Sequence, residues 1–135
     1  MKYTIDPPVF KVLPGLRVLI VSAHGIQHSE SSAQYANERL LNAWNQVPSA
    51  LSGYANPQSH PLVAAWRKAY GALGLPGSKY TTSVEALMKR ASKTGCTPRS
   101  ISPLVDLYNA LSIRHVVPFG AFDTDAFPAD AAMDL

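Results

Sequence analysis

The stretch TTSVEALMKRASKTGCTPRSISPLVDLYNALS, residues 81–112, predicts two consecutive helices and sets the fold class. Ser83 is a favourable N-cap for the first helix, and Gly95 is a typical stop beyond its end. The second helix opens with Ser102 as its N-cap and Pro103, whose fixed φ suits a first helical turn. Apolar residues three and four apart predict the two inward faces, which are Val84, Leu87, Met88 and Ala91, then Leu104, Leu107, Tyr108 and Leu111.

Two further helices are predicted upstream of this stretch. Pro61 occupies a first-turn position, and the inward face of its helix would comprise Val63, Trp66, Tyr70 and Leu73. Earlier in the chain, Ser31 and Gln34 have the spacing of a capping box. The helix that they begin would end at Pro48, before a polar loop over residues 49–59. Its inward face would comprise Ala36, Leu40, Leu41, Trp44 and Val47.

Two apolar runs predict β-strands. Arg17–Val21 reads RVLIV, which is typical of a buried strand, and His115–Phe119 has a similar character. Helices combined with at least two strands indicate an α+β fold, with helices packed on a small mixed β-sheet.

Length and composition place the chain among small globular proteins. Its 135 residues, 47% hydrophobic and 16% charged, predict a single domain covering residues 1–135. Cys96 is the only cysteine, which excludes an internal disulfide and fits a reducing compartment. The longest nearly uncharged apolar run, Val18–Ala23, is far shorter than a membrane helix. We therefore expect a cytoplasmic protein that does not contact a membrane.

Charge is divided unevenly along the chain. Residues 1–63, 64–99 and 100–135 carry net charges of +1, +6 and −4. The basic segment is interspersed with Trp66, Tyr70 and Tyr80, a pattern compatible with contact to a phosphate backbone. The alternative is that its lysines form solvated helix faces.

Familiar catalytic and cofactor motifs are absent from the sequence. It has no Gly-x-Ser-x-Gly elbow and neither of the usual glycine-rich phosphate loops. His24 and His28 are four residues apart, but Gly25 between them argues against a helical metal site. We expect no metal and no cofactor, and no catalytic residue can be named.

Three blocks of residues in the second half of the chain form an ordered pattern. The first is a Ser-x-Glu-Ala-Leu-x-x-Arg helix, matched by Ser83, Glu85, Ala86, Leu87 and Arg90. The second is a Val-Asp-x-x-Asn helix, matched by Val105, Asp106 and Asn109. The third is a Pro-x-Gly-x-x-Asp turn, matched by Pro118, Gly120 and Asp123. Together these blocks resemble the B3/B4 editing and tRNA-binding domain of the phenylalanyl-tRNA synthetase beta subunit, and the free-standing proteins built from it more closely. The resemblance covers about residues 60–127.

The resemblance implies the helix-bearing part of a three-layer module. Because the family module continues for further strands, we expect this domain to be incomplete at its C-terminus. Such a half-module would expose apolar surface, so we also expect self-association or a complementary partner chain.

The resemblance also implies a function and a set of site residues. It implies recognition of an aminoacyl-tRNA or an amino acid, with hydrolysis of mischarged aminoacyl-tRNA in trans as the candidate reaction. The alternative is a non-catalytic tRNA- or protein-binding module. Gly120 stands where the bacterial synthetase form has a histidine, so that base is missing. The substrate-binding candidates are Asn109, Gly120, Asp106, Phe119 and Arg90, and the tRNA-contact candidates are Lys79, Lys89 and Lys93.

Two of these candidates also stand out without the family. Asp106 lies in the first turn of its predicted helix, where the helix dipole favours a carboxylate. Asn109 is three residues further on and shares its face. A mid-helix asparagine favours a specific hydrogen bond, made either to a neighbouring backbone segment or to a ligand. Arg90 could bind phosphate or pair with Glu85 or Asp106.

Overall fold

The structure is a computed structural model that describes residues 2–128 and 132–134. Its backbone contacts divide the chain into two compact units. One comprises Met1–His24 with Ala121–Leu135, and the other comprises Gly25–Gly120. The larger unit contains the helices predicted from the sequence.

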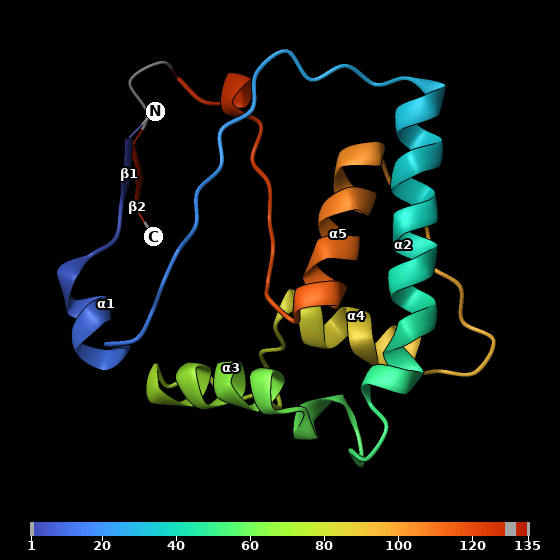
Figure 1. Cartoon of the computed structure of the whole chain (residues 1–135). Helices are drawn as coiled ribbons and strands as arrows, with labels where there is room; N and C mark the ends of the chain where they lie inside the picture. Colours follow the sequence, from blue (N-terminus) through green and yellow to red (C-terminus); the bar gives the residue numbers. More distant parts are fainter. Residues whose placement is uncertain (1, 129–131, 135) are drawn as a thin grey trace. The chain divides into compact units, whose positions relative to one another are not determined.

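Four α-helices and one short 3₁₀-helix build the Gly25–Gly120 unit (Figure 1). Helix α2 packs against both α5 and α4, and α4 also contacts α5. The 3₁₀-helix η1 contacts α3 and α4. In chain order the elements are α2 (Glu30–Ala50), η1 (Pro57–Ser59), α3 (Pro61–Ala72), α4 (Ser83–Ala91) and α5 (Pro103–His115).

Local capping explains where these helices begin. The backbone N–H of Ser32 donates to Ser29 Oγ at 3.1 Å, and the N–H of Ser29 donates to Ser32 Oγ at 2.9 Å, so α2 starts with a reciprocal capping box. This box lies two residues before the predicted pair. Thr82, rather than Ser83, caps α4, whereas Ser102 caps α5 as predicted.

Pro48 does not end α2, which continues to Ala50. A proline in the last turn removes one backbone donor without preventing two more helical residues.

The core of this unit lies where α2, α4 and α5 meet. Leu40, Trp44 and Val47 of α2 are buried, as predicted, but Leu41 is exposed. The predicted inward face of α4 is buried in full, comprising Val84, Leu87, Met88 and Ala91. Removing such buried aliphatic side chains typically costs about 2–5 kcal/mol, so these residues stabilise the packing of the three helices.

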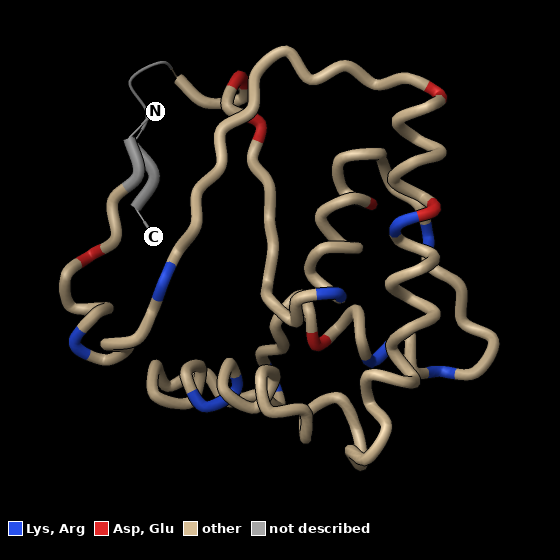
Figure 2. Tube along the Cα trace, in the orientation of Figure 1, with Lys and Arg blue, Asp and Glu red and all other residues tan. Residues whose placement is uncertain are grey.

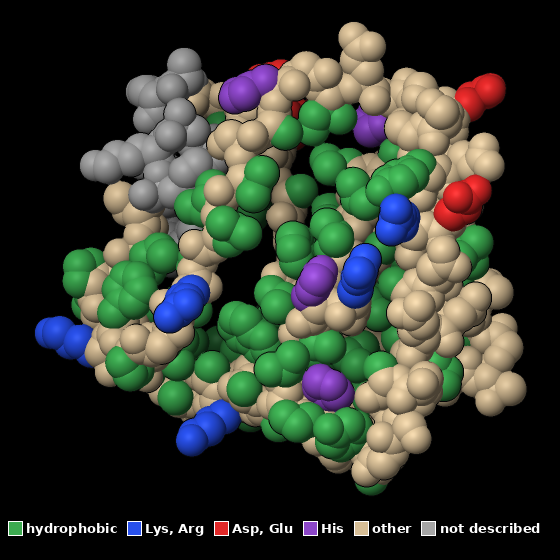
Figure 3. All heavy atoms as spheres, in the orientation of Figure 1, with side chains coloured by type: hydrophobic (Ala, Val, Ile, Leu, Met, Phe, Trp, Pro, Cys, Tyr) green, Lys and Arg blue, Asp and Glu red, His purple; other side chains and the backbone are tan. Residues whose placement is uncertain are grey.

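Helix α5 is rotated relative to its predicted orientation. Its buried residues are Asp106, Ala110, Ser112 and Ile113, whereas Leu104 on the predicted inward face is 39% exposed. Helix α3 also buries less than predicted, because Val63 alone of its apolar face is buried. Hydrophobic side chains therefore remain at the surface over α3 and α5 (Figure 3).

The α+β prediction is wrong, because the fold is helical and no mixed sheet packs against the helices of the described chain. Arg17–Val21 is extended without strand pairing, and Leu19 and Val21 are 86% and 78% exposed. His115 ends α5, and Val116 adopts a left-handed conformation with φ 52°, which interrupts the second predicted strand. An apolar run becomes a strand only when another strand supplies backbone partners, and none is placed beside either run in the described residues.

The smaller unit contains short elements. The strands β1 (Lys2–Thr4) and β2 (Ala132–Asp134) pair in parallel, with Tyr3 opposite Met133. The unit also contains α1 (Pro7–Val12) and the 3₁₀-helix η2 (Thr124–Ala126), which Asp123 caps. No helix in the described part of the chain has the length and apolar character needed to cross a membrane. Association with a second chain stays a prediction.

Candidate functional site

One hollow in the Gly25–Gly120 unit is a groove of about 450 Å³ between α2, α4, α5 and the segment that joins α4 to α5. We call it the α4–α5 groove. Helix α2 supplies apolar side chains, α4 and the joining segment each supply an arginine, and α5 supplies an amide. Its lining consists of Leu40, Trp44, Leu87, Arg90, Pro98, Arg99, Ser100, Ile101 and Asn109.

Trp44 fixes one wall of the groove. Its Nε1 donates a hydrogen bond to the backbone carbonyl of Cys96 at 2.8 Å, which ties α2 to the residues after α4. The same side chain borders a second hollow of about 320 Å³, to which Lys93 and Cys96 also contribute. Trp44 is buried, so this bond satisfies the one polar atom of its ring.

Asp106 holds the segment between α4 and α5 through two hydrogen bonds. Its carboxylate is 1% exposed and accepts hydrogen bonds from Ser100 Oγ and, at 3.0 Å, from the backbone N–H of Ile101. Together these two hydrogen bonds hold the segment before α5 in place. Asp106 is therefore an anchor for the segment that carries Arg99, and it does not line the groove.

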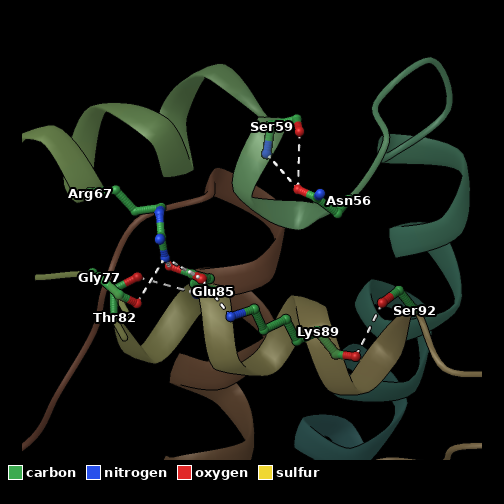
Figure 4. Close-up of polar contacts among 8 residues, drawn as sticks. All are labelled: Asn56, Ser59, Arg67, Gly77, Thr82, Glu85, Lys89 and Ser92. Carbon is green, nitrogen blue, oxygen red and sulfur yellow. Dashed lines mark hydrogen bonds and ion pairs between the residues drawn. The ribbon is translucent and has the colours of Figure 1, made fainter. Parts of the chain in front are cut away.

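The second buried acid, Glu85, belongs to a separate cluster (Figure 4). Glu85 is 0% exposed, and Arg67 Nη1 of α3 lies 2.9 Å from its Oε1. Lys89 Nζ, one turn further along α4, lies 2.7 Å from the same oxygen. Burial of an acid between two cations is stabilising only while the cations remain in contact with it.

Gly77 makes room for this cluster. Arg67 Nη1 also donates to the carbonyl of Gly77 at 3.2 Å, and a Cβ on Gly77 would lie 2.6 Å from Arg67 Cζ. A side chain at position 77 would therefore push the guanidinium away from Glu85.

The two buried acids leave the surface of the larger unit positively charged. Residues 25–120 contain nine Lys and Arg and four Asp and Glu, a net charge of +5. Figure 2 shows basic positions outnumbering acidic ones along α3, α4 and α5. Arg90 and Arg99 on the α4–α5 groove are exposed, and neither forms an ion pair in the described residues. The groove consequently presents two free cations beside an apolar wall.

The structure brings two of the five predicted substrate-binding residues together. Arg90 and Asn109 both line the α4–α5 groove, and Asn109 is half-buried. Gly120 and Phe119 lie beyond the end of α5, are exposed and do not line it. The carbonyl of Phe119 instead accepts a hydrogen bond from Ser83 Oγ at 3.4 Å.

The three predicted tRNA-contact lysines occupy different settings. Lys89 is paired with Glu85, and this ion pair replaces the one considered between Arg90 and Glu85. Lys79 is exposed and lies over the ring of Tyr80, with Nζ 5.5 Å from the ring centroid. Lys93 is exposed beside the second hollow.

Neither Arg99 nor Trp44 was predicted from the sequence as a site residue, although Trp44 was predicted to face inward. Arg99 was counted only as part of the basic segment. Its place on the groove depends on the hydrogen bond from the neighbouring Ser100 to Asp106, which the sequence does not reveal. No group of three His, Cys, Asp or Glu side chains that could hold a metal ion occurs among the described residues.

One comparison with known proteins, a match to a family model, agrees with the resemblance. No curated protein and no solved structure matches the chain. The family model described as the B3/4 domain matches residues 65–134, which include Arg90, Arg99 and Asn109 of the groove. This match covers more than half of the chain, and the chain belongs to the B3/4 domain family.

Proposed function

We propose that this chain binds tRNA non-catalytically, with the α4–α5 groove holding the acceptor end. The observation that carries the proposal is the pair of exposed arginines, Arg90 and Arg99, on a groove whose neighbouring acids are both buried. The B3/4 domain is associated with tRNA synthetases, and this association favours a tRNA-related ligand over other polyanions.

Electrostatics supports a phosphate-bearing ligand. Asp106 is anchored to Ser100 and Ile101, and Glu85 is enclosed by Arg67 and Lys89, so neither carboxylate offsets the exposed arginines at the surface. Arginine binds phosphate through a planar fork of donors, and each phosphate contact releases counterions from the nucleic acid. The exposed cations therefore favour association with a polynucleotide backbone.

The side chains that line the groove favour binding over hydrolysis. Ester hydrolysis needs a group that activates water, usually a histidine or a carboxylate within hydrogen-bond reach of it. The residues that line the groove include neither. A deacylation assay with several mischarged tRNAs tests this choice. Release of the amino acid above the uncatalysed rate would show that the chain is a hydrolase, and the proposal of non-catalytic binding would be abandoned.

Removing the two groove arginines should weaken tRNA binding. For Arg90→Ala with Arg99→Ala we expect Kd at about 0.1 M salt to rise about 25- to 60-fold, the effect of losing two phosphate contacts. The slope of log Kd against log salt should fall by about 1.4 to 1.8. Fluorescence anisotropy of an end-labelled tRNA across a salt series measures both quantities.

A matched control removes the same charge elsewhere. Lys68 and Arg114 are exposed on α3 and α5 and do not line the groove. Lys68→Ala with Arg114→Ala should change Kd by much less than the groove pair. Equal losses in the two double variants would show that tRNA responds only to net charge, and the groove assignment would then be abandoned.

Asn109 should contribute to binding more than to stability. Its amide makes no hydrogen bond in the described residues and faces the groove, so Asn109→Ala removes no internal contact that holds the fold. We expect a change of less than about 0.5 kcal/mol in the free energy of unfolding and a Kd for tRNA raised about three- to tenfold. Urea denaturation and anisotropy separate the two. A large loss of stability with unchanged Kd would make Asn109 a structural residue.

A further inference from the structure

The α4–α5 groove has a pronounced chemical asymmetry. Arg90 and Arg99 can receive an anion, and the amide of Asn109 can donate and accept hydrogen bonds. The rest of the lining is apolar apart from Ser100, with Ile101 exposed and Leu40, Trp44, Leu87 and Pro98 behind it. An occupant that matches the groove combines an anionic group with a flat or apolar body.

An ammonium group finds no acidic partner in this groove. Asp106, which anchors the joining segment, is 1% exposed and already accepts two hydrogen bonds, and Glu85 is fully buried between two cations in its separate cluster. An α-amino group placed here would face Arg90 and Arg99, and like charges at short range repel. The groove therefore disfavours the amino-acid part of an aminoacyl-tRNA.

We propose that the groove reads a nucleotide and not an amino acid: the phosphate binds Arg90 and Arg99, and the base lies against the apolar wall beside Asn109. This proposal rests on the proposed function and specifies its ligand. The groove volume of about 450 Å³ lies within the usual range of small-molecule sites, about 300–1,000 Å³. One consequence is that tRNA binding does not depend on aminoacylation.

Competition experiments test the ligand class. AMP should displace labelled tRNA from the wild-type chain, whereas adenosine, inorganic phosphate and free phenylalanine should each be at least tenfold weaker competitors. A tRNA charged with phenylalanine and the same tRNA uncharged should bind with Kd values within about twofold. Both phosphate and base are then required, as the two sides of the groove demand.

Three results of the competition experiments would overturn the nucleotide assignment. They are displacement by phenylalanine as effective as that by AMP, displacement by inorganic phosphate or adenosine as effective as that by AMP, and a charged tRNA that binds much more tightly than the uncharged one. The proposed function would survive any of them, because tRNA would still bind.

Equilibrium dialysis with AMP measures nucleotide binding directly. Together with the competition data, it shows whether the natural ligand of the groove is a free nucleotide or the terminal nucleotide of a tRNA. Binding of AMP that is lost in Arg90→Ala with Arg99→Ala supports the ligand class. If AMP binds in this way but does not displace tRNA, the groove does not hold the acceptor end of tRNA. The proposed function then fails while the nucleotide assignment stands. If AMP does not bind at all, the nucleotide assignment fails.

Discussion

Replacing both cations beside Glu85, as Arg67→Met with Lys89→Met, is expected to lower the free energy of unfolding by about 3–5 kcal/mol. The carboxylate of Glu85 is 0% exposed, and its ionic partners are Arg67 at 2.9 Å and Lys89 at 2.7 Å. With both cations removed, an ionised group would remain buried without compensation, which is among the most costly changes in a protein interior.

The single variants should cost much less than the double variant. Arg67→Met leaves Lys89 on Glu85, and Lys89→Met leaves Arg67, so we expect about 1–2 kcal/mol for each. Their side chains are about a third exposed, so part of each interaction is screened by water. The double variant should therefore exceed the sum of the single variants, because only it strands the carboxylate.

A third substitution distinguishes charge from packing. Glu85→Gln in the background of the two methionines replaces the stranded carboxylate by a neutral amide and should restore part of the lost stability. Urea denaturation followed by circular dichroism measures each variant. Lys68→Met with Arg90→Met is the control, because both residues are exposed and form no ion pair within the part of the chain that the structure describes. It should stay within about 0.5 kcal/mol. A double variant no less stable than this control would show that the cluster does not support the fold.

This cluster changes how tRNA-binding variants are to be designed. Lys89 was predicted to contact tRNA, but charge reversal there would place a second carboxylate beside buried Glu85. The variant would lose binding through loss of the fold. Lys93 and Lys79 are exposed and form no ion pair with any described residue, so they are suitable positions for charge reversal.

The helices were predictable because their signals are local. Ser102 followed by Pro103 marks the start of α5, and Pro61 marks the start of α3, as the sequence predicted. The four apolar residues predicted to face inward on α4 are all buried, since they form one stripe, whereas the burial of Glu85 on the same helix was not predicted. Caps and periodicity act within a few residues and need no knowledge of the rest of the chain.

The rotation of α5 and the absence of a sheet depend on contacts between distant segments. Asp106 turns toward Ser100 and Ile101, so the small residue Ala110 faces the core and Leu104 reaches the surface. Similarly, RVLIV at residues 17–21 has strand character, but only a neighbouring strand can make it one. Apolar patterns reveal the preference of a segment and not the availability of its partner.

The candidate site was half visible in the sequence for the same reason. Arg90 and Asn109 belong to two helical blocks of the B3/4 resemblance, and the structure places both on one groove. Arg99 and Trp44 complete that groove through loop contacts, made by Ser100 to Asp106 and by Trp44 to Cys96. No spacing rule predicts contacts that a loop establishes.

The loop contact at Asp106 leads to the second large effect. Asp106→Ala should lower the free energy of unfolding by about 2–4 kcal/mol, because hydrogen bonds from Ser100 Oγ and the Ile101 N–H to a charged acceptor are lost together. Ser100→Ala removes one of them and should cost about 1 kcal/mol. The control Glu38→Ala removes an exposed carboxylate from α2 and should cost less than about 0.5 kcal/mol. Urea denaturation ranks the three variants.

Asp106→Ala also tests how stability and binding are connected at this groove. When the bonds to Asp106 are lost, the segment carrying Arg99 is no longer fixed beside Arg90, so Kd for tRNA should rise even at temperatures where the variant is fully folded. Ser100→Ala should show the same effect in weaker form. If Asp106→Ala weakens binding without loss of stability, and Ser100→Ala does neither, then Asp106 contacts the ligand directly, as the sequence had suggested. If stability falls while the folded protein binds tRNA with unchanged Kd, the joining segment does not belong to the binding site. The site would then consist of Arg90, Asn109 and their neighbours on α4 and α5.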